Sequence, residues 1–146
     1  PDDPERAMLG VTLESRPAYD FPVDVAIDSG TVGGPSAGLA FALAILDRLT
    51  PGLLTGGERI AVTGTIELDG SVGRVGGVRQ KTEAAIRAGA RVFLVPGDEL
   101  AEAVTAADGR IEVRPVATLE DALDVLADLG GDPVPAPDAA AAPTGG

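Results

Sequence analysis

Apolar side chains recur at every second position over residues 9–13 and again over 21–28. A period of two is typical of strands that bury one face and expose the other. We therefore predict two half-buried strands near the start of the chain.

A nearly unbroken apolar run follows a short glycine-containing loop, from Pro35 to about Leu49. Proline suits the first position of a helix because its missing N–H has no partner there anyway. Because apolar residues surround the helix on nearly all sides, we expect it to be central and covered on several sides. Its longest apolar stretch, 37–46, is shorter than the roughly 18 residues that predict a membrane span.

The middle of the chain alternates strand and helix patterns. Residues 59–68 predict a strand, Asp69 and Gly70 a tight turn, and 71–75 the partner strand of a hairpin. Two glycines then interrupt the pattern before a helix predicted over 78–88, which Gly89 would close.

Two further helices are predicted, over 98–107 and 118–130. Asp98 and Thr118 are residues that can cap the first turn with a side-chain oxygen. The core-facing positions of the last helix are leucines: Leu119, Leu123, Leu126 and Leu129.

Short buried strands are predicted over 92–95 and 111–113. Because the strands occur both in a hairpin and in β-α-β steps, we predict an α+β fold with a mixed sheet and packed helices. We predict that the segment 9–130 forms one domain, preceded by a flexible segment, 1–8, and followed by a disordered Pro/Ala/Gly tail, 131–146.

Composition excludes several functions. The formal net charge of −12 argues against nucleic acid or an anionic membrane as the main partner. The chain has no Cys and no His, so it has no zinc site of the usual kind. Carboxylates alone can bind Mg²⁺ or Ca²⁺, but no acidic loop has the spacing of an EF-hand. We expect no metal and no cofactor.

Lys81 is the single lysine among eleven cationic side chains, and the rest are arginines. A lysine can lose its proton and act as a base, whereas an arginine stays protonated. On a helical projection Lys81 lies on the side of Val78 and Ala85, opposite Arg79. Burial and the positive end of the helix dipole would both lower its pKa. The alternative is that its stem lines the edge of the core and its charge reaches water.

Ser36 is the serine placed best for Lys81 to activate. It stands where a glycine-rich loop enters the buried helix, and N–H groups at a helix start can stabilise an oxyanion. A neutral lysine is an alternative to histidine as the base that activates a serine. The alternative is that Ser36 is an ordinary residue of the first helical turn.

Three sequence blocks, taken in order, resemble the conserved blocks of the Lon protease proteolytic domain. They are Gly-Gly-Pro-Ser-Ala-Gly at 33–38, Val-Thr-Gly at 62–64 and Gly-Gly-Val-Arg-Gln-Lys-Thr-Glu-Ala-Ala at 76–85. The resemblance covers about 21–96 and continues more weakly to about Leu129. It implies the ribosomal protein S5 domain 2-like fold and a serine endopeptidase that uses a Ser–Lys dyad.

The resemblance also implies roles for individual residues. Ser36 would be the nucleophile and Lys81 the base, with the N–H groups around Ser36 and Ala37 holding the oxyanion. Thr63 matches a threonine thought to orient the lysine, although a β-branched strand residue is its simpler interpretation. Asp28, just before the glycine-rich loop, is a further candidate for tuning the site.

The chain lacks the G-x-x-x-x-G-K-[ST] motif for nucleotide binding, and it lacks a basic residue before Gly-Pro-Ser that many Lon enzymes have. It looks closer to ATP-independent Lon-like proteins that carry a PDZ domain and a membrane anchor. By that resemblance the PDZ domain and anchor would precede Pro1, and the protease domain would lie outside the cytoplasmic membrane. Protein or peptide substrates and a homo-oligomeric ring are expected.

Two other functions stay open. One is a non-catalytic assembly or regulatory module with the same fold, which a peptide-cleavage assay would distinguish. The other is a small-molecule kinase-like domain that binds phosphate at a helix start, which measurable ATP binding would favour.

Overall fold

The computed structural model describes residues 34–135 together with Ala26, Asp28 and Gly30. The flexible segment predicted over 1–8, the strand over 9–13 and most of the strand over 21–28 lie outside these residues. Of the tail predicted over 131–146, the part over 136–146 also lies outside them. In the described part of the chain, no helix combines the length and the apolar character needed to cross a membrane.

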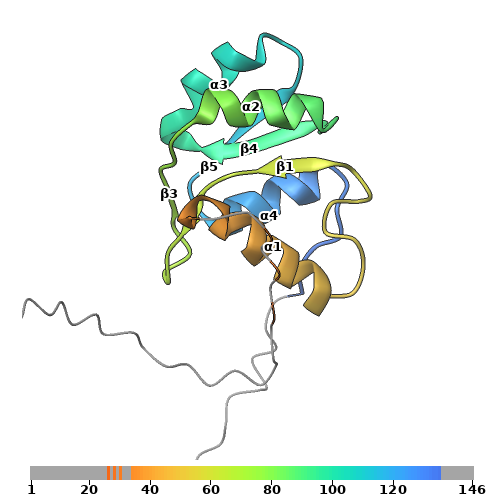
Figure 1. Ribbon diagram of the computed structural model, residues 1–146. Coiled ribbons are helices and arrows are strands. Elements are labelled where there is room, and N and C mark those ends of the chain that lie inside the picture. The colour runs from red at the N-terminus through yellow and green to blue at the C-terminus, as the bar shows by residue number, and fades with distance from the viewer. Residues whose placement is uncertain (1–25, 27, 29, 31–33, 136–146) are drawn as a thin grey trace, which may run out of the picture.

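Three parallel strands form the centre of the domain (Figure 1). They are β1 (Ile60–Val62), β4 (Val92–Pro96) and β5 (Glu112–Val116), in the spatial order β1-β4-β5. The register places Val62 beside Leu94. Every residue of β4 is buried, as a central strand covered on both faces should be, and this explains its unbroken apolar sequence.

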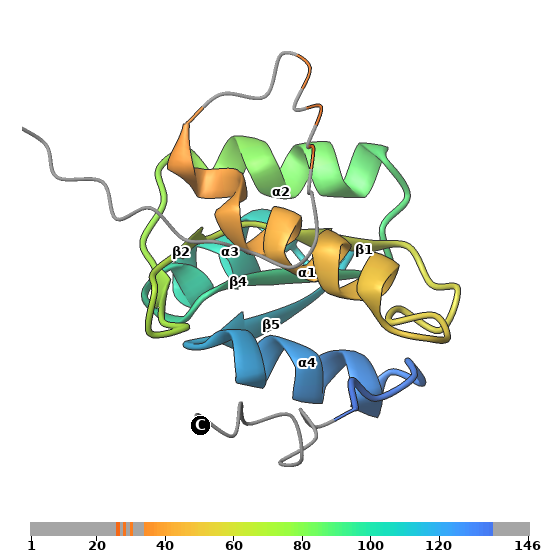
Figure 2. The same ribbon diagram turned by 90° about the horizontal axis from the view of Figure 1, so that it is seen from below.

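Two pairs of helices cover the two faces of this sheet (Figures 1 and 2). On one face lie α2 (Val78–Arg87) and α3 (Leu100–Ala107), and on the other α1 (Gly38–Leu49) and α4 (Leu119–Asp128). Successive side chains of a strand point to opposite faces. Val92 and Leu94 therefore belong to an α1/α4 cluster, and Phe93 and Val95 to an α2/α3 cluster.

The predicted fold class, α+β with helices packed on a sheet, is confirmed. Antiparallel pairing within the described part of the chain is found in a hairpin of β2 (Thr65–Ile66) and β3 (Val72–Gly73) and in an isolated bridge between Ser71 and Thr118. The predicted turn at Asp69 and Gly70 is confirmed, because Gly70 N–H donates to the carbonyl of Glu67 at 3.0 Å.

The single strand predicted over 59–68 is wrong, because the chain leaves the sheet at the end of β1. The N–H of Gly64 donates to the carbonyl of Ser36 at 2.9 Å, and its own carbonyl accepts from the N–H of Leu39 at 3.1 Å. These two groups bind the start of α1, so neither can join a strand ladder. A Cβ on Gly64 would lie 2.7 Å from Val72 Cγ1, so a side chain there would clash with the hairpin.

The cap predicted at Thr118 is confirmed. Thr118 Oγ1 accepts from the N–H of Asp121 at 3.0 Å, and the Asp121 carboxylate accepts from the N–H of Thr118 at 3.1 Å. The cap predicted at Asp98 is wrong, because a short 3-10 turn, η2 (Gly97–Glu99), precedes α3 and no side chain caps that helix. The Asp98 carboxylate instead lies 3.6 Å from Arg74 Nε.

Other boundaries differ by a few residues. The strand predicted over 111–113 starts one residue later and continues to Val116, because the whole of β5 pairs with β4. After α4, Gly131 N–H donates to the carbonyl of Leu126, and Asp132 N–H donates to the carbonyl of Leu53. These bonds attach the chain to the domain two residues beyond Gly130.

The first predicted helix begins with a 3-10 turn, η1 (Pro35–Ala37), and continues as α1. Leu39 and Leu43 are buried, whereas Ala44 and Leu49 are exposed. We predicted that other elements would pack on several sides of this helix. Within the described part of the chain, one side of the helix is instead exposed.

Candidate active site

Ser36 lies in the 3-10 turn that leads into α1 and is half-buried. Gly34 precedes the turn with φ 89° and ψ 164°, a backbone conformation that favours glycine. Pro35 then starts the turn at the position predicted for it. The local sequence thus directs the chain sharply into the helix and leaves Ser36 at its entrance.

Thr63 holds the backbone of Ser36 from the end of β1. It is 3% exposed, and its Oγ1 donates to the carbonyl of Ser36 at 3.2 Å. The N–H of Gly64 donates to the same carbonyl, and the N–H of Thr63 donates to the carbonyl of Leu94 at 3.0 Å. The entrance to α1 is therefore tied to β1 and, through it, to the central strand β4.

Gly38 lets the second strand of this region approach the helix. A Cβ on Gly38 would lie 3.0 Å from Ile66 Cγ2 and 3.1 Å from the backbone nitrogen of Ile66. A larger residue would push β2 away from α1. The Gly-Pro-Ser-Ala-Gly motif thus has a packing role as well as its candidate chemical one.

Lys81 lies on the inner side of α2, as its helical position predicted. Val78 and Ala85 on that side are buried and Lys81 is half-buried, whereas Arg79 and Arg87 are exposed. Burial lowers the pKa of Lys81 from its ordinary value of 10.5, and attraction to the Glu99 carboxylate raises the pKa in part. The balance favours the neutral amine more than at a fully hydrated lysine.

One open crevice brings Ser36, Thr63 and Lys81 together. It runs past β1, with η1 supplying one wall and α2 the other. Its remaining lining is small or apolar: Ala37, Ala61, Val62, Ala84, Ala85, Ala88 and Phe93. The hydrogen bonds of the described residues do not include one between Ser36 Oγ and Lys81 Nζ. Catalytic hydrogen bonds are often longer before substrate binds.

Asp28 stands apart from the other candidates. It is exposed, its Oδ1 accepts from the N–H of Gly30 at 2.9 Å, and it does not line the crevice. The structure therefore brings four of the five candidate residues to one crevice: Ser36, Ala37, Thr63 and Lys81.

Glu99 is a residue that the sequence interpretation missed. It is 5% exposed, and its Oε1 accepts from Arg74 Nε at 3.1 Å. The charge of its carboxylate raises the pKa of Lys81 in part. The sequence feature that could have pointed to Glu99 is its position shortly after the buried strand predicted over 92–95. The carboxyl ends of parallel strands meet at one edge of a sheet, where binding sites commonly form. The sequence interpretation instead assigned the neighbouring Asp98 a capping role.

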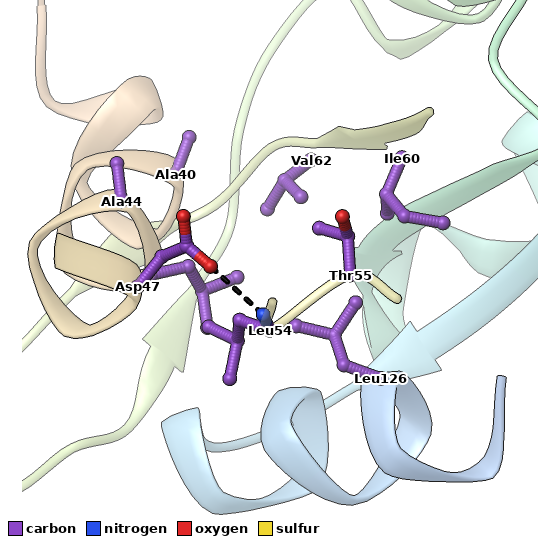
Figure 3. A pocket seen from close by; sticks show the side chains of 9 residues that line it. Ala40, Ala44, Asp47, Leu54, Thr55, Ile60, Val62 and Leu126 are labelled. Atoms are coloured by element: carbon purple, nitrogen blue, oxygen red, sulfur yellow. Dashed lines mark hydrogen bonds between the residues drawn. The ribbon is translucent and has the colours of Figure 1, made fainter. Parts of the chain in front are cut away.

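A second pocket lies between α1 and α4 (Figure 3). Leucine, isoleucine, valine and alanine side chains form most of its wall, and Asp47 is its one charged residue. Asp47 Oδ1 accepts from the N–H of Leu54 at 2.8 Å, a bond drawn in Figure 3. The Asp47 carboxylate thus holds the loop that contains Leu54. Thr55 carries the one hydroxyl group that lines this pocket, and no lysine lies there to activate it.

No cluster of metal-binding side chains is found among the described residues. No three or more Asp or Glu side chains in the described part gather closely enough to hold a metal ion. Among the described residues that line the crevice, Lys81 is the one charged group.

The sequence matches that of known proteolytic domains. The family model for the Lon protease (S16) C-terminal proteolytic domain matches residues 10–128. Lon protease 1 of Herpetosiphon aurantiacus is 39% identical over 98 residues, which is 67% of this chain and 12% of that protein. The archaeal Lon protease of Archaeoglobus fulgidus is 36% identical over 101 residues, or 68% of this chain and 16% of that protein.

A longer match is found with the Lon protease of Trichlorobacter lovleyi. It is 32% identical over 126 residues, which cover 83% of this chain and 15% of that protein. The chain therefore spans less than a fifth of the length of each of these three relatives.

Proposed function

The chain belongs to the family of Lon protease (S16) C-terminal proteolytic domains, and we propose that it is a serine endopeptidase domain with a Ser–Lys dyad. Ser36 is the nucleophile and Lys81 the general base. The observation that carries this proposal is their placement: the two side chains come from opposite layers of the domain and line one crevice. The lowered pKa of Lys81 supports a role as a base.

The reaction begins when neutral Lys81 takes the proton of the Ser36 hydroxyl as Oγ attacks the carbonyl carbon of the scissile bond. Backbone N–H groups at Ser36 and Ala37 hold the oxyanion at the helix start. Protonated Lys81 then gives its proton to the leaving amine. Water, deprotonated by the same lysine, hydrolyses the acyl-enzyme and restores Ser36.

Thr63 positions both partners. Its hydroxyl proton is directed at the carbonyl of Ser36, so the lone pairs of Oγ1 can accept from the Lys81 ammonium. The Thr63 side chain is buried and β-branched, which restricts its rotation. It therefore limits the directions in which Lys81 can point.

The substrate is an extended or unfolded protein segment. The alanines of α2 leave room beside the dyad, and β1 is the outer strand of its sheet within the described residues. An outer strand can pair with an extended peptide through backbone hydrogen bonds. Such pairing would carry a scissile bond along the crevice past Ser36.

We propose further, from the resemblance to ATP-independent Lon-like proteins, that cleavage by this chain needs no ATP; the sequence itself carries no nucleotide-binding motif. From the family resemblance alone, we also propose that the chain assembles into a homo-oligomeric ring. By the same resemblance, the chain lies outside the cytoplasmic membrane in a protein with a PDZ domain and a membrane anchor.

The test compares cleavage of an unfolded protein substrate by the wild-type chain and by Ser36→Ala and Lys81→Arg, without ATP. The arginine keeps the positive charge but cannot give up its proton. Both variants should cleave at less than roughly a thousandth of the wild-type rate, as expected when a nucleophile or its base is lost. The wild-type rate should rise with pH as Lys81 loses its proton.

Ser71→Ala is the matched control, because Ser71 lies in the hairpin and its hydroxyl donates to Asp69. It should cleave like the wild-type chain. Thr63→Val, which lacks the hydroxyl, should fall between the wild-type chain and Lys81→Arg. Equal rates in wild type, Ser36→Ala and Lys81→Arg would overturn the proposal. The absence of cleavage by all of them would favour the non-catalytic module.

A further inference from the structure

The Glu99 carboxylate is buried, but only one of its two oxygens has a hydrogen-bond partner among the described residues. Its Oε1 accepts from Arg74 Nε at 3.1 Å, whereas its Oε2 is buried and lacks a hydrogen-bond partner among the described residues. Arg74 covers it from the solvent side, since the arginine side chain is 76% exposed. Burying a carboxylate costs free energy unless cations or donors compensate it. Such an oxygen requires a structural or chemical explanation.

The fold places Glu99 at the same edge of the sheet as the proposed active site. Thr63 follows β1 and Glu99 lies just beyond β4, and these strands are parallel neighbours whose carboxyl ends share one edge. Phe93, on β4, lines the crevice together with Lys81. The helix that begins directly after Glu99, α3, packs on α2, which carries Lys81.

The other charged side chains on the elements around Lys81 are exposed or interact with arginines. On α2, Glu83 is bound to Arg110 on the outer side of the helix, and Arg79 is exposed. On η2, Asp98 is exposed and faces Arg74. The turn η1 and the strands β1 and β4, which also contribute to the crevice wall, carry no charged residue.

We propose that Glu99 is the positioning residue for Lys81, and that its carboxylate stabilises the ammonium that forms when Lys81 takes the Ser36 proton. The inference rests on the proposed function, because it assigns Lys81 the role of the base. Attraction to Glu99 raises the pKa of Lys81 against the effect of burial, which is consistent with this role. Glu99 thus keeps the lysine basic enough to accept a proton in a crevice that favours its neutral form.

Because Lys81 is the only lysine, this role can be measured at a single atom. The chain is labelled with ¹³Cε-lysine, and the one lysine side-chain signal is titrated in wild type, Glu99→Gln and Glu83→Gln. Both substitutions remove one negative charge, but Glu83 faces away and serves as the matched control. The midpoint should move to lower pH in Glu99→Gln, because the ammonium loses its partner, and should stay unchanged in Glu83→Gln.

The pH profile of kcat/KM supplies the second readout. In Glu99→Gln the rising limb should move to lower pH, and the plateau should fall by about two- to fivefold, the range for loss of a partly exposed ion pair. A residue with a purely structural role would lower the plateau without moving the limb. Glu99→Asp, which keeps the charge on a shorter side chain, should restore part of the wild-type midpoint.

An unchanged lysine midpoint in folded Glu99→Gln would overturn the inference. Should that variant not fold, the titration of Glu99→Asp decides: a midpoint at or above that of wild type overturns the inference, and a lower one supports it. The two proposals fail separately. If the lysine midpoint shifts in Glu99→Gln but no variant cleaves substrate, the protease proposal fails and the coupling of Glu99 to Lys81 stands. If cleavage depends on Ser36 but the lysine midpoint does not move, the protease proposal stands and the role of Glu99 fails.

Discussion

The two faces of the central sheet are packed with different side chains. The buried α1/α4 cluster is mostly leucine and valine, with Leu39, Leu43, Leu94 and Leu126 among its members. The buried α2/α3 cluster contains three alanines: Ala85, Ala103 and Ala107. Figure 2 shows α1 and α4 covering the first face. Large side chains fill the first layer, whereas in the second layer helices with small side chains approach closely.

This difference explains how the proposed active site is divided. Ser36, the proposed nucleophile, is attached to the start of the leucine-rich helix α1, which packs on the buried leucines of the α1/α4 cluster. Lys81, the proposed base, lies on α2, where the small side chains of Ala84, Ala85 and Ala88 line the crevice beside it. The α1/α4 layer therefore holds Ser36 in place, and the small side chains on α2 leave room for a substrate in the crevice.

The largest effect should come from Leu39→Ala, which removes a fully buried side chain from the α1/α4 cluster. The loss of buried surface and the resulting cavity should lower the free energy of unfolding by about 2–5 kcal/mol. Denaturant unfolding measures the change. Leu49→Ala, at an exposed position on the same helix, should change stability by about 0.5 kcal/mol or less. Similar losses in both variants would contradict a dense core beneath α1.

A smaller effect is expected from enlarging a side chain in the other layer. Ala103 is fully buried between α3 and its neighbours, so Ala103→Leu should overpack the α2/α3 cluster. The expected loss is about 1–3 kcal/mol, measured by the same unfolding experiment. The exposed Val104→Ala on the same helix is the control. A stable Ala103→Leu would mean that this layer has unfilled space rather than close packing.

The smallest effect on stability, and the one that depends on pH, concerns Lys81→Met. Because the folded-state pKa of Lys81 lies below 10.5, the unfolded chain binds more protons between these two values. The cost of the charged lysine is therefore fully present below the folded-state pKa and disappears as pH rises towards 10.5. Lys81→Met should be more stable than wild type at pH 7, within about 0.5 kcal/mol.

That advantage of Lys81→Met should shrink in alkaline solution, which thermal unfolding across a pH series measures. Arg79→Met, on the exposed side of the same helix, should show no such dependence, since an arginine stays charged. An advantage that grew with pH would contradict a lowered lysine pKa.

Local patterns predicted the elements whose apolar residues follow one period. The run at 35–49, the helix at 78–88, the buried strand at 92–95 and the cap at Thr118 are all found in the structure. The break after β1 was not predictable from its surroundings, because the alternation continues through Gly64. What interrupts it is a pair of hydrogen bonds to the start of α1, more than twenty residues earlier in the chain.

The sequence by itself determined which groups were available for chemistry: one lysine, no histidine, no cysteine, and a serine at the start of a helix. The resemblance to the Lon proteolytic domain also pointed to Thr63. Only the tertiary structure decided that Ser36 and Lys81 share a crevice, that Asp28 does not line it, and that Glu99 is buried just beyond the end of β4. Residue type and spacing act over a few turns of one element, whereas a site at the edge of a parallel sheet depends on strands that pair across distant parts of the chain.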